Sequence, residues 1–140
     1  QSNKAILGSS KNVSYLKNKS KIEYLLYQLD STKSKYLENA ITSLKDAQKI
    51  SPTDPKIPYS LSIFYSILFD KTRDYKYRDL SLKAIDHSIE LKSNYRDGYF
   101  LKAQLLEKFG KIIKAKEALQ YILDNINSKD EEAKEFLKKL

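Results

Sequence analysis

Residues 40–52, AITSLKDAQKISP, contain the spacing of small and large side chains that decides the fold. The spacing recurs 41 residues further on, and its first three positions recur again after another 34 residues. The matched positions are Ala40, Leu44, Ala47 and Pro52, then Ser81, Ile85, Ser88 and Ser93, then Ala115, Leu119 and Ile122. Self-similarity at such a period indicates a repeat protein, in which each unit needs its neighbours to bury its apolar face.

Apolar residues recur at helical spacing on both sides of this stretch, as in Ile22, Leu25, Leu26 and Leu29. No segment alternates apolar and polar residues in the manner of a strand. The sequence therefore predicts seven helices, at residues 12–31, 34–50, 55–70, 74–91, 95–109, 111–126 and 129–140. Short links between helices require antiparallel neighbours, so consecutive helices are expected to pair as hairpins.

The breaks between the predicted helices have the residue types that end and start helices. Asp54 is the expected N-cap of the third helix, followed by a proline whose missing N–H costs no hydrogen bond in the first turn. Asn94 is the expected cap of the fifth helix, and Ser128 with Glu131 forms a capping-box pattern before the last one. Gly110 can adopt a left-handed conformation that lets two helices reverse direction.

The repeated frame resembles the tetratricopeptide repeat, a helix–turn–helix unit with small and large residues at fixed positions. The third copy fits the pattern with Tyr99, Ala103, Leu106, Gly110, Ala115 and Leu119. The second copy has Leu61, Tyr65, Ser81, Ile85 and Ser88, and the first has Tyr24, Ala40, Leu44, Ala47 and Pro52. Small residues at these positions let helix backbones approach closely while the large ones fill the gaps beside them.

The chain departs from the repeat pattern in each copy. The first copy lacks the turn glycine and the small residue early in its first helix, where the matching position is Gln28. The third copy has Ile122 where alanine is usual. The second copy carries seven extra residues near 70–76, because its spacing is 41 rather than 34. Seven residues make about two helical turns, so we expect a longer second hairpin with a protruding tip rich in charge and tyrosine.

The resemblance implies an all-α fold, a right-handed superhelical array of antiparallel helix hairpins. Residues 1–140 are expected to form one domain, with a flexible start at 1–11 and a capping helix at 129–140. The repeats are expected near 21–54, 55–95 and 96–128. The capping helix carries an apolar face of Ala133, Phe136, Leu137 and Leu140, which would cover the last repeat.

The composition limits the chemistry that the chain can perform. Cysteine is absent, which excludes disulfides, thiol catalysis and cysteine-based metal sites. His87 is the only histidine, and none of the three glycines belongs to a phosphate-binding loop, so no catalytic residue, metal site or cofactor is predicted. No apolar run approaches the roughly 20 residues that span a bilayer. We therefore expect a soluble segment that is not an enzyme.

The formal net charge of +8 raises nucleic-acid binding as a hypothesis. Of the 26 basic residues, only Arg73, Arg78 and Arg96 are arginine, whose planar guanidinium is favoured in the recognition of phosphates and base edges. The lysines are interleaved with aspartate and glutamate. Most of the charge is therefore assigned to solvated helix faces, and nucleic-acid binding is the least favoured of the functions considered.

The resemblance places a binding groove on the concave face, which is formed by the first helix of each hairpin. The residues expected to line this groove are Lys56, Tyr59, Ile63, Ser66, Asp97, Phe100, Gln104 and Lys108. Tyr59 suits such a place because tyrosine, which combines apolar area with a hydrogen-bonding tip, is enriched at binding hot spots. Tyr24, Tyr65 and Tyr99 fall instead at positions that the repeat assigns to the core.

Family members that bind the carboxyl-terminal Asp or Glu of chaperones use a clamp of Lys and Asn on the first helix. The positions that match the clamp in this chain are Leu25 and Leu29. An apolar pair cannot hold carboxylates, so a chaperone-tail clamp is not expected. That end of the groove would be covered by residues 1–20 or meet an apolar ligand.

The leading functional hypothesis is a non-catalytic protein-interaction scaffold that holds a peptide or partner protein in the concave groove. The alternative is the soluble C-terminal region of a larger bacterial membrane protein. Residues 91–95 and 121–123, with the terminal helix, resemble repeats that follow the membrane spans of O-antigen ligase-like glycan enzymes. The sequence specifies neither the partner nor the oligomeric state. The compartment is the cytoplasm by default, or outside it if the membrane-tail hypothesis holds.

Overall fold

The computed structural model describes the backbone of residues 2–140 and the side chains of residues 11–140. Within that part of the chain there are helices and turns but no strand. The elements are α1 (Ser2–Leu29), α2 (Ser34–Ile50), α3 (Lys56–Thr72), α4 (Tyr75–Leu91), α5 (Arg96–Lys108), α6 (Ile112–Tyr121), the π-helical segment η1 (Ile122–Ile126) and α7 (Glu131–Lys139). The side chains of residues 1–10 lie outside the described part of the chain, so the expected flexibility of residues 1–11 stays a prediction.

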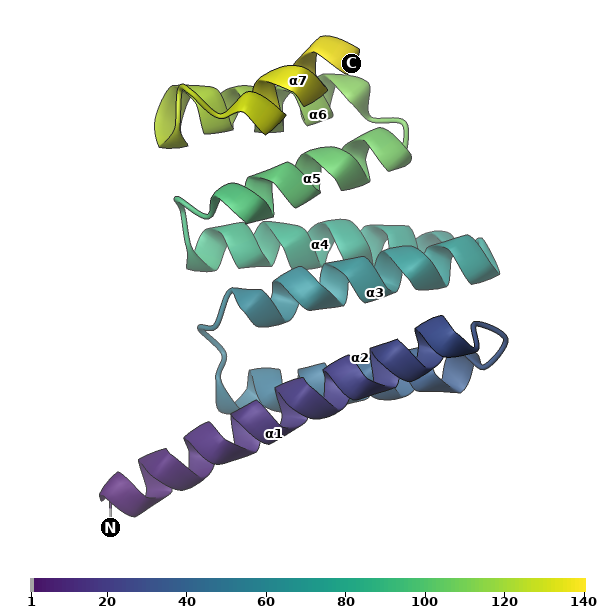
Figure 1. The fold of residues 1–140 in the computed structure, drawn as a ribbon, viewed down its shortest axis with the longest axis vertical. Helices are drawn as coiled ribbons and strands as arrows, with labels where there is room; N and C mark the ends of the chain where they lie inside the picture. The colour runs from purple at the N-terminus through teal and green to yellow at the C-terminus, as the bar shows by residue number, and fades with distance from the viewer. Residues whose placement is uncertain (1) are drawn as a thin grey trace.

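Consecutive helices pair as antiparallel hairpins: α1 with α2, α3 with α4, and α5 with α6 (Figure 1). The hairpins are stacked along the long axis of the molecule, with the N-terminus at one end and α7 at the other. The second helix of each hairpin packs on the first helix of the next, α2 on α3 and α4 on α5. The all-α array of helix hairpins that the sequence predicts is confirmed.

The helix boundaries follow the predicted breaks closely, except at the start. The second predicted helix has the same bounds as α2, whereas α1 begins well before the predicted start at residue 12. The predicted cap Asp54 lies one residue before the N-cap position of α3, which is Pro55, but its Oδ1 still accepts a hydrogen bond from the Lys56 backbone N–H at 3.0 Å. Gly110 has a φ of 77°, which confirms the left-handed turn between α5 and α6.

Two predicted caps are wrong. Asn94 does not cap α5, which begins after Tyr95 without a side-chain cap bond. The cap of α7 is Asp130 rather than Ser128, because the Asp130 side chain lies directly before the helix and accepts from the Ala133 N–H at 3.0 Å. A carboxylate at this position also suits the positive end of the helix dipole.

Buried serines hold neighbouring helix backbones in close contact. The Ser20 hydroxyl of α1 donates to the Ala40 carbonyl of α2 at 3.0 Å. In the second hairpin, the Ser81 hydroxyl of α4 donates to the Ser62 carbonyl of α3 at 2.7 Å. A small side chain lets the backbones approach, and the hydrogen bond satisfies a hydroxyl that would be costly to bury alone.

Ser20 is the small residue that the first copy was predicted to lack. It is only 2% exposed, whereas Gln28, at the predicted position, lies on the surface. The paired small residues are 20 apart in the first hairpin and 19 apart in the second. The prediction at Gln28 is therefore wrong. It applied the separation between Ala103 and Ala115 of the third copy to the first hairpin, which placed the contact between α1 and α2 too close to the turn that joins them.

The second hairpin is lengthened as expected. Its helices α3 and α4 have 17 residues each, against 13 in α5 and 10 in α6. Its tip is anchored on both neighbouring hairpins rather than protruding alone. The Lys71 ammonium group donates to the Ser31 carbonyl and lies 5.0 Å from the ring centre of Tyr27. On the other side, the rings of Phe69 and Phe109 meet edge to face at 5.4 Å.

The third hairpin accommodates a larger residue at its last repeat position. Ile122 is fully buried in one cluster with Leu119 and Ala133, so it packs against α7. The backbone widens there into the π-helical segment, in which the Asn127 N–H donates to the Ile122 carbonyl at 2.8 Å.

An ion pair fastens α7 to the start of α5. Arg96 donates from Nε to Asp130 Oδ2 at 2.6 Å and from Nη2 to Oδ1 at 3.0 Å. Asp130 is only 8% exposed. The hydrogen bonds from Arg96 and from the Ala133 N–H outweigh the effect of burial and lower the pKa of the Asp130 carboxyl. The array is thus closed by a charged pair between hairpin three and its cap.

Replacing Ser20 with leucine should destabilise the protein by about 1–3 kcal/mol, because a larger side chain at this contact forces α1 away from α2. The matched change Gln28→Leu, on the same helix, should alter the free energy of unfolding by less than about 0.5 kcal/mol. Urea denaturation followed by circular dichroism measures both. A larger loss for the Gln28 variant would show that the first hairpin has a different register.

Replacing Asp130 with asparagine should lower stability at neutral pH by about 1–3 kcal/mol, since a hydrogen-bonded charge pair is lost. The folded-state pKa of Asp130 is lowered, so its contribution is present above the unfolded pKa near 3.8 and is lost as the pH falls below it. Melting temperatures between pH 6 and pH 3 should therefore fall less steeply for Asp130→Asn than for the wild type. The exposed control Asp46→Asn should follow the wild type; equal slopes for all three proteins would refute the role assigned to Asp130.

Candidate functional site

A hollow of about 280 Å³ lies between α1 and α3 and extends to the start of α5. Most of its walls come from α1 and α3, the first helices of two hairpins, where a binding groove is expected, with Leu44 of α2 and Tyr95 before α5 completing it. Its lining residues are Lys17, Ser20, Lys21, Leu44, Lys56, Tyr59, Ser60, Phe64 and Tyr95. We call this hollow the α1–α3 groove.

Three lysines give the α1–α3 groove a positive rim. Lys17 is held by Asp54, with 2.8 Å between Nζ and Oδ2. Partial burial acts to raise the pKa of the Asp54 carboxyl, but hydrogen bonds from Lys17 and the Lys56 N–H outweigh it and the pKa is lowered. Among the described side chains, no carboxylate lies within ion-pair distance of the Lys21 or Lys56 ammonium groups. The rim therefore offers two cations for an anionic ligand.

Aromatic rings form much of the groove wall. Tyr59 of α3 and Tyr95 before α5 have ring centres 5.6 Å apart, and Phe64 lies 5.0 Å from Tyr24 of α1. Burial raises the pKa of both Tyr59 and Tyr95, so their hydroxyls stay protonated at neutral pH. The groove thus combines apolar surface with hydrogen-bond donors and positive charge.

Four of the predicted groove residues lie along α3 or next to it. Lys56 and Tyr59 line the α1–α3 groove. Ile63 is half-buried and packs against the core clusters of both neighbouring hairpins. Ser66 is buried, and its hydroxyl accepts a hydrogen bond from Lys108 Nζ at 2.6 Å. The structure brings Ser66 and Lys108 together as a contact between hairpins.

The other predicted residues do not join that groove. Lys108 also pairs with Asp70 at 2.7 Å, which ties α5 to α3. Asp97 is exposed and lies 3.2 Å from Arg96 Nη1. Phe100 lines a separate hollow of about 440 Å³ beside α7, with three glutamates and Phe136. Gln104 is exposed. The eight predicted residues therefore fall into distinct places rather than one continuous site.

Lys17 and Lys21 are the groove residues that sequence reasoning missed. Lys17 lies three residues before the buried Ser20, as Tyr59 does before Ser62 and Phe100 before Ala103. Lys21 follows Ser20 directly, as Ile63 follows Ser62. The spacing of the second copy could have located them. Ser62 and Ser81 are 19 residues apart, and counting 19 residues back from Ala40 gives Lys21, one residue from the observed partner Ser20.

The expected place of a clamp on the first helix was therefore wrong. Leu25 and Leu29 are 57% and 84% exposed and do not line the groove. With Ser20 as the small residue, the equivalent positions are Lys17 and Lys21. Because Leu25 and Leu29 are not in the α1–α3 groove, their apolar side chains do not argue against carboxylate binding there.

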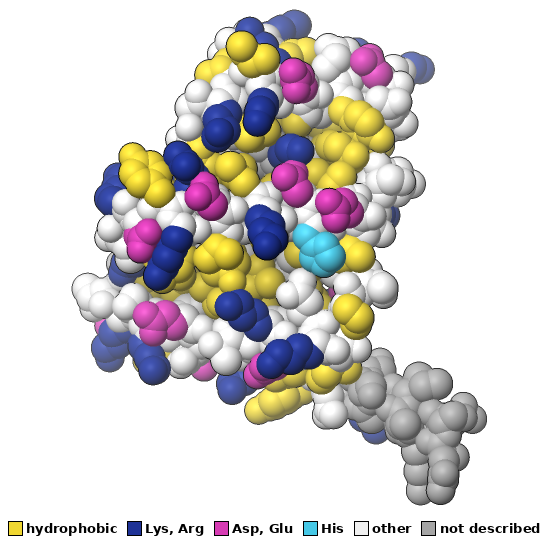
Figure 2. Space-filling view, turned by 180° about the vertical axis from the view of Figure 1, so that it is seen from behind, with side chains coloured by type: hydrophobic (Ala, Val, Ile, Leu, Met, Phe, Trp, Pro, Cys, Tyr) yellow, Lys and Arg dark blue, Asp and Glu magenta, His cyan; other side chains and the backbone are white. Residues whose placement is uncertain are grey.

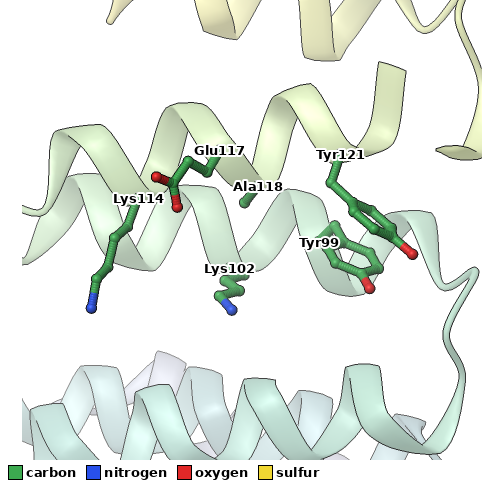
Figure 3. Close-up of a pocket in the computed structure, with 6 residues that line it drawn as sticks. All are labelled: Tyr99, Lys102, Lys114, Glu117, Ala118 and Tyr121. Atoms are coloured by element: carbon green, nitrogen blue, oxygen red, sulfur yellow. The ribbon is translucent and has the colours of Figure 1, made fainter. Parts of the chain in front are cut away.

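A further hollow, of about 340 Å³, lies between α5 and α6 (Figure 3). The rings of Tyr99 and Tyr121 are stacked with centres 4.3 Å apart. Burial, together with a hydrogen bond to Tyr121, raises the pKa of Tyr99 to about 12. Lys102 extends towards α4, where its Nζ lies 2.8 Å from Asp86 Oδ1. This hollow therefore combines a stacked pair of tyrosine rings with a lysine that is paired to α4.

The described residues contain no group of three or more His, Cys, Asp or Glu side chains placed to hold a metal ion. None of the described helices combines the length and the apolar character that crossing a membrane requires.

No protein-family model and no curated protein matches the sequence. Solved structures do match the fold. One is the first tetratricopeptide-repeat domain of Spaghetti (RPAP3) bound to the HSP90 peptide SRMEEVD, with a TM-score of 0.69, 19% identity and coverage of 93% of each chain. Another is the Yersinia enterocolitica type III secretion translocator chaperone SycD, with a TM-score of 0.65, 15% identity and coverage of 89% of each chain. The chain therefore has the fold of a tetratricopeptide-repeat domain.

Proposed function

We propose that this chain is a non-catalytic protein-interaction module that binds a peptide of a partner protein in the α1–α3 groove. The observation that carries the proposal is the placement of Lys21 and Lys56 on one rim, beside the rings of Tyr59 and Tyr95. Aromatic side chains supply contact area at low cost in conformational entropy, and the lysines supply charge at the edge.

The groove chemistry suits an acidic peptide with an apolar side chain. The groups on its rim are ammonium groups and tyrosine hydroxyls, which donate hydrogen bonds to carboxylates. Phe64 and Leu44 form an apolar floor that a leucine, methionine or valine side chain of the ligand can cover. The HSP90 peptide SRMEEVD, bound by the similar domain of Spaghetti, combines these two features.

The groove is already formed in the unbound chain, which favours binding. Lys17 joins α1 to Asp54 before α3, and Tyr24 packs on Phe64, so the two helices that border the groove are fixed relative to each other. A ligand therefore does not have to bring the walls together, and less of its binding free energy is lost to ordering.

The other two functional hypotheses receive no specific support. The membrane-tail hypothesis stays a prediction, because it concerns sequence outside these residues. For nucleic-acid binding, lysines and arginines on the face seen in Figure 2 are interspersed with aspartates and glutamates. Nucleic-acid binding favours clustered cations, and this face does not provide such a cluster.

The groove predicts charge-dependent binding of acidic peptides. A panel of fluorescein-labelled peptides of seven to twelve residues, including SRMEEVD, should contain members that bind with micromolar to submillimolar affinity in fluorescence anisotropy. Replacing glutamate by glutamine in a bound member should weaken it, and affinity should fall as salt rises. The double variant Lys21→Glu/Lys56→Glu should weaken binding by roughly tenfold or more.

The matched control is Lys116→Glu/Lys129→Glu, which changes the net charge equally at exposed positions outside the groove. It should retain binding. If no acidic peptide binds, the proposed class of ligand is wrong. If the two double variants lose affinity equally, the effect is one of net charge alone, and the α1–α3 groove is not the binding site.

A further inference from the structure

The outer face of α1 carries a continuous row of exposed apolar side chains. Ile22 is 58% exposed, Leu25 57%, Leu26 36% and Leu29 84%. Their spacing of three and four residues places them on one side of the helix. Ser20 and Tyr27, which are buried, lie on the opposite side. The row is therefore separate from both the core and the α1–α3 groove, and its size calls for an explanation.

Two positions of this row, Ile22 and Leu26, match buried residues of other hairpins, whereas Leu25 and Leu29 match the half-buried Ile67 and the exposed Lys71 of α3. Ile22 lies two residues after the buried small residue Ser20, as Phe64 does after Ser62 and Leu105 after Ala103. Phe64 and Leu105 are only 6% and 4% exposed. One turn later, Leu26 corresponds to Leu68, which is 6% exposed.

In α3 and α5, this face is covered by the second helix of the preceding hairpin. Phe64 belongs to one core cluster with Ile41 and Leu44 of α2, and Leu105 to another with Ile85 of α4. At Ile22 and Leu26, the apolar row of α1 is thus the continuation of the interface by which the hairpins stack. By analogy with α3 and α5, this face of α1 can pack against a further helix.

The interface between α4 and α5 also contains one charged contact with the covering helix. Lys102 lies one residue before Ala103 and pairs with Asp86 of the covering helix α4 at 2.8 Å. Lys19 occupies the same register position on α1, one residue before Ser20, and is exposed. A helix lying over α1 as α4 lies over α5 would place a residue opposite Lys19, and an acidic residue there would complete the contact.

We propose that the outer face of α1 docks an amphipathic helix of a partner protein, whose apolar side covers Ile22, Leu25, Leu26 and Leu29 and whose acidic flank faces Lys19. The helix would take the place that α4 takes on α5. The docking surface lies away from the α1–α3 groove and does not depend on the function proposed for that groove.

A second copy of the chain fits this surface less well. Antiparallel pairing of two α1 helices brings the lysine-rich flanks of both copies together, and like charges in an interface are unfavourable. The other end of the array does not supply a covering helix either. The outward positions of α7 are exposed charged residues, including Glu131, Glu135 and Lys138. The observed charges thus favour a partner with acidic flanks.

The test uses the 140-residue chain and two synthetic helical probes of about 18 residues, five turns of helix. Both carry leucines along one side; the first has glutamates at the flanking positions and the second has lysines. Fluorescence anisotropy should show saturable binding of the glutamate probe and roughly tenfold weaker binding of the lysine probe. Lys19→Glu should reduce this preference.

Variants locate the probe on the molecule. Leu25→Glu/Leu29→Glu should weaken binding of the glutamate probe by roughly tenfold or more, with an unchanged melting temperature because both side chains are exposed. Ile113→Glu, which alters a 76% exposed residue of α6, should bind as the wild type does. Lys56→Glu should also leave helix binding unchanged, which separates this surface from the α1–α3 groove.

Several results would overturn the inference. They are absence of glutamate-probe binding, equal binding of the two probes, and full binding by Leu25→Glu/Leu29→Glu. A wild-type dimer in analytical ultracentrifugation that this double variant dissociates would assign the face to a second copy instead. Binding to phosphatidylserine vesicles that the double variant abolishes, without binding of the glutamate probe, would assign it to a membrane surface.

Discussion

The close approach of helix backbones at small buried residues is the constraint on which the rest of this structure depends. Ser20 meets Ala40 and Ser62 meets Ser81 through hydroxyl-to-carbonyl hydrogen bonds, so each pair fixes both the distance and the register of its hairpin. A hairpin becomes stable by placing its apolar side chains on those of its neighbour. The position of the small pair along the helices therefore decides which side chains reach the groove and which face outward.

That register explains both surfaces of α1. With Ser20 against α2, Lys17 and Lys21 lie on the groove side, and Ile22, Leu25 and Leu29 lie away from it. A register centred on Gln28 would move every α1 side chain by two turns. The groove and the outer face of α1 are thus two consequences of one contact, although the ligands proposed for them differ in form: an acidic peptide and an amphipathic helix.

The fold could be predicted from the sequence because small residues, helical periodicity and turn residues all agree on the same hairpins. Ala40, Ser81 and Ala115 mark the second helices, and Gly110 marks a turn. The register of the first hairpin could not be obtained in this way, because the repeat pattern supplies a standard spacing and α1 and α2 are both longer. For the site, Lys56 and Tyr59 follow from the pattern, whereas the contact of Lys108 with Ser66 depends on how two hairpins stack.

Nuclear Overhauser effects of the Ala40 methyl group, measured in the folded, methyl-labelled chain, test the register of α1 against α2. We expect cross-peaks between this methyl group and the Ser20 side chain and none to Gln28. Cross-peaks to Gln28 in place of Ser20 would refute this register, because Lys17 and Lys21 would then leave the groove and the apolar row of α1 would turn to another side.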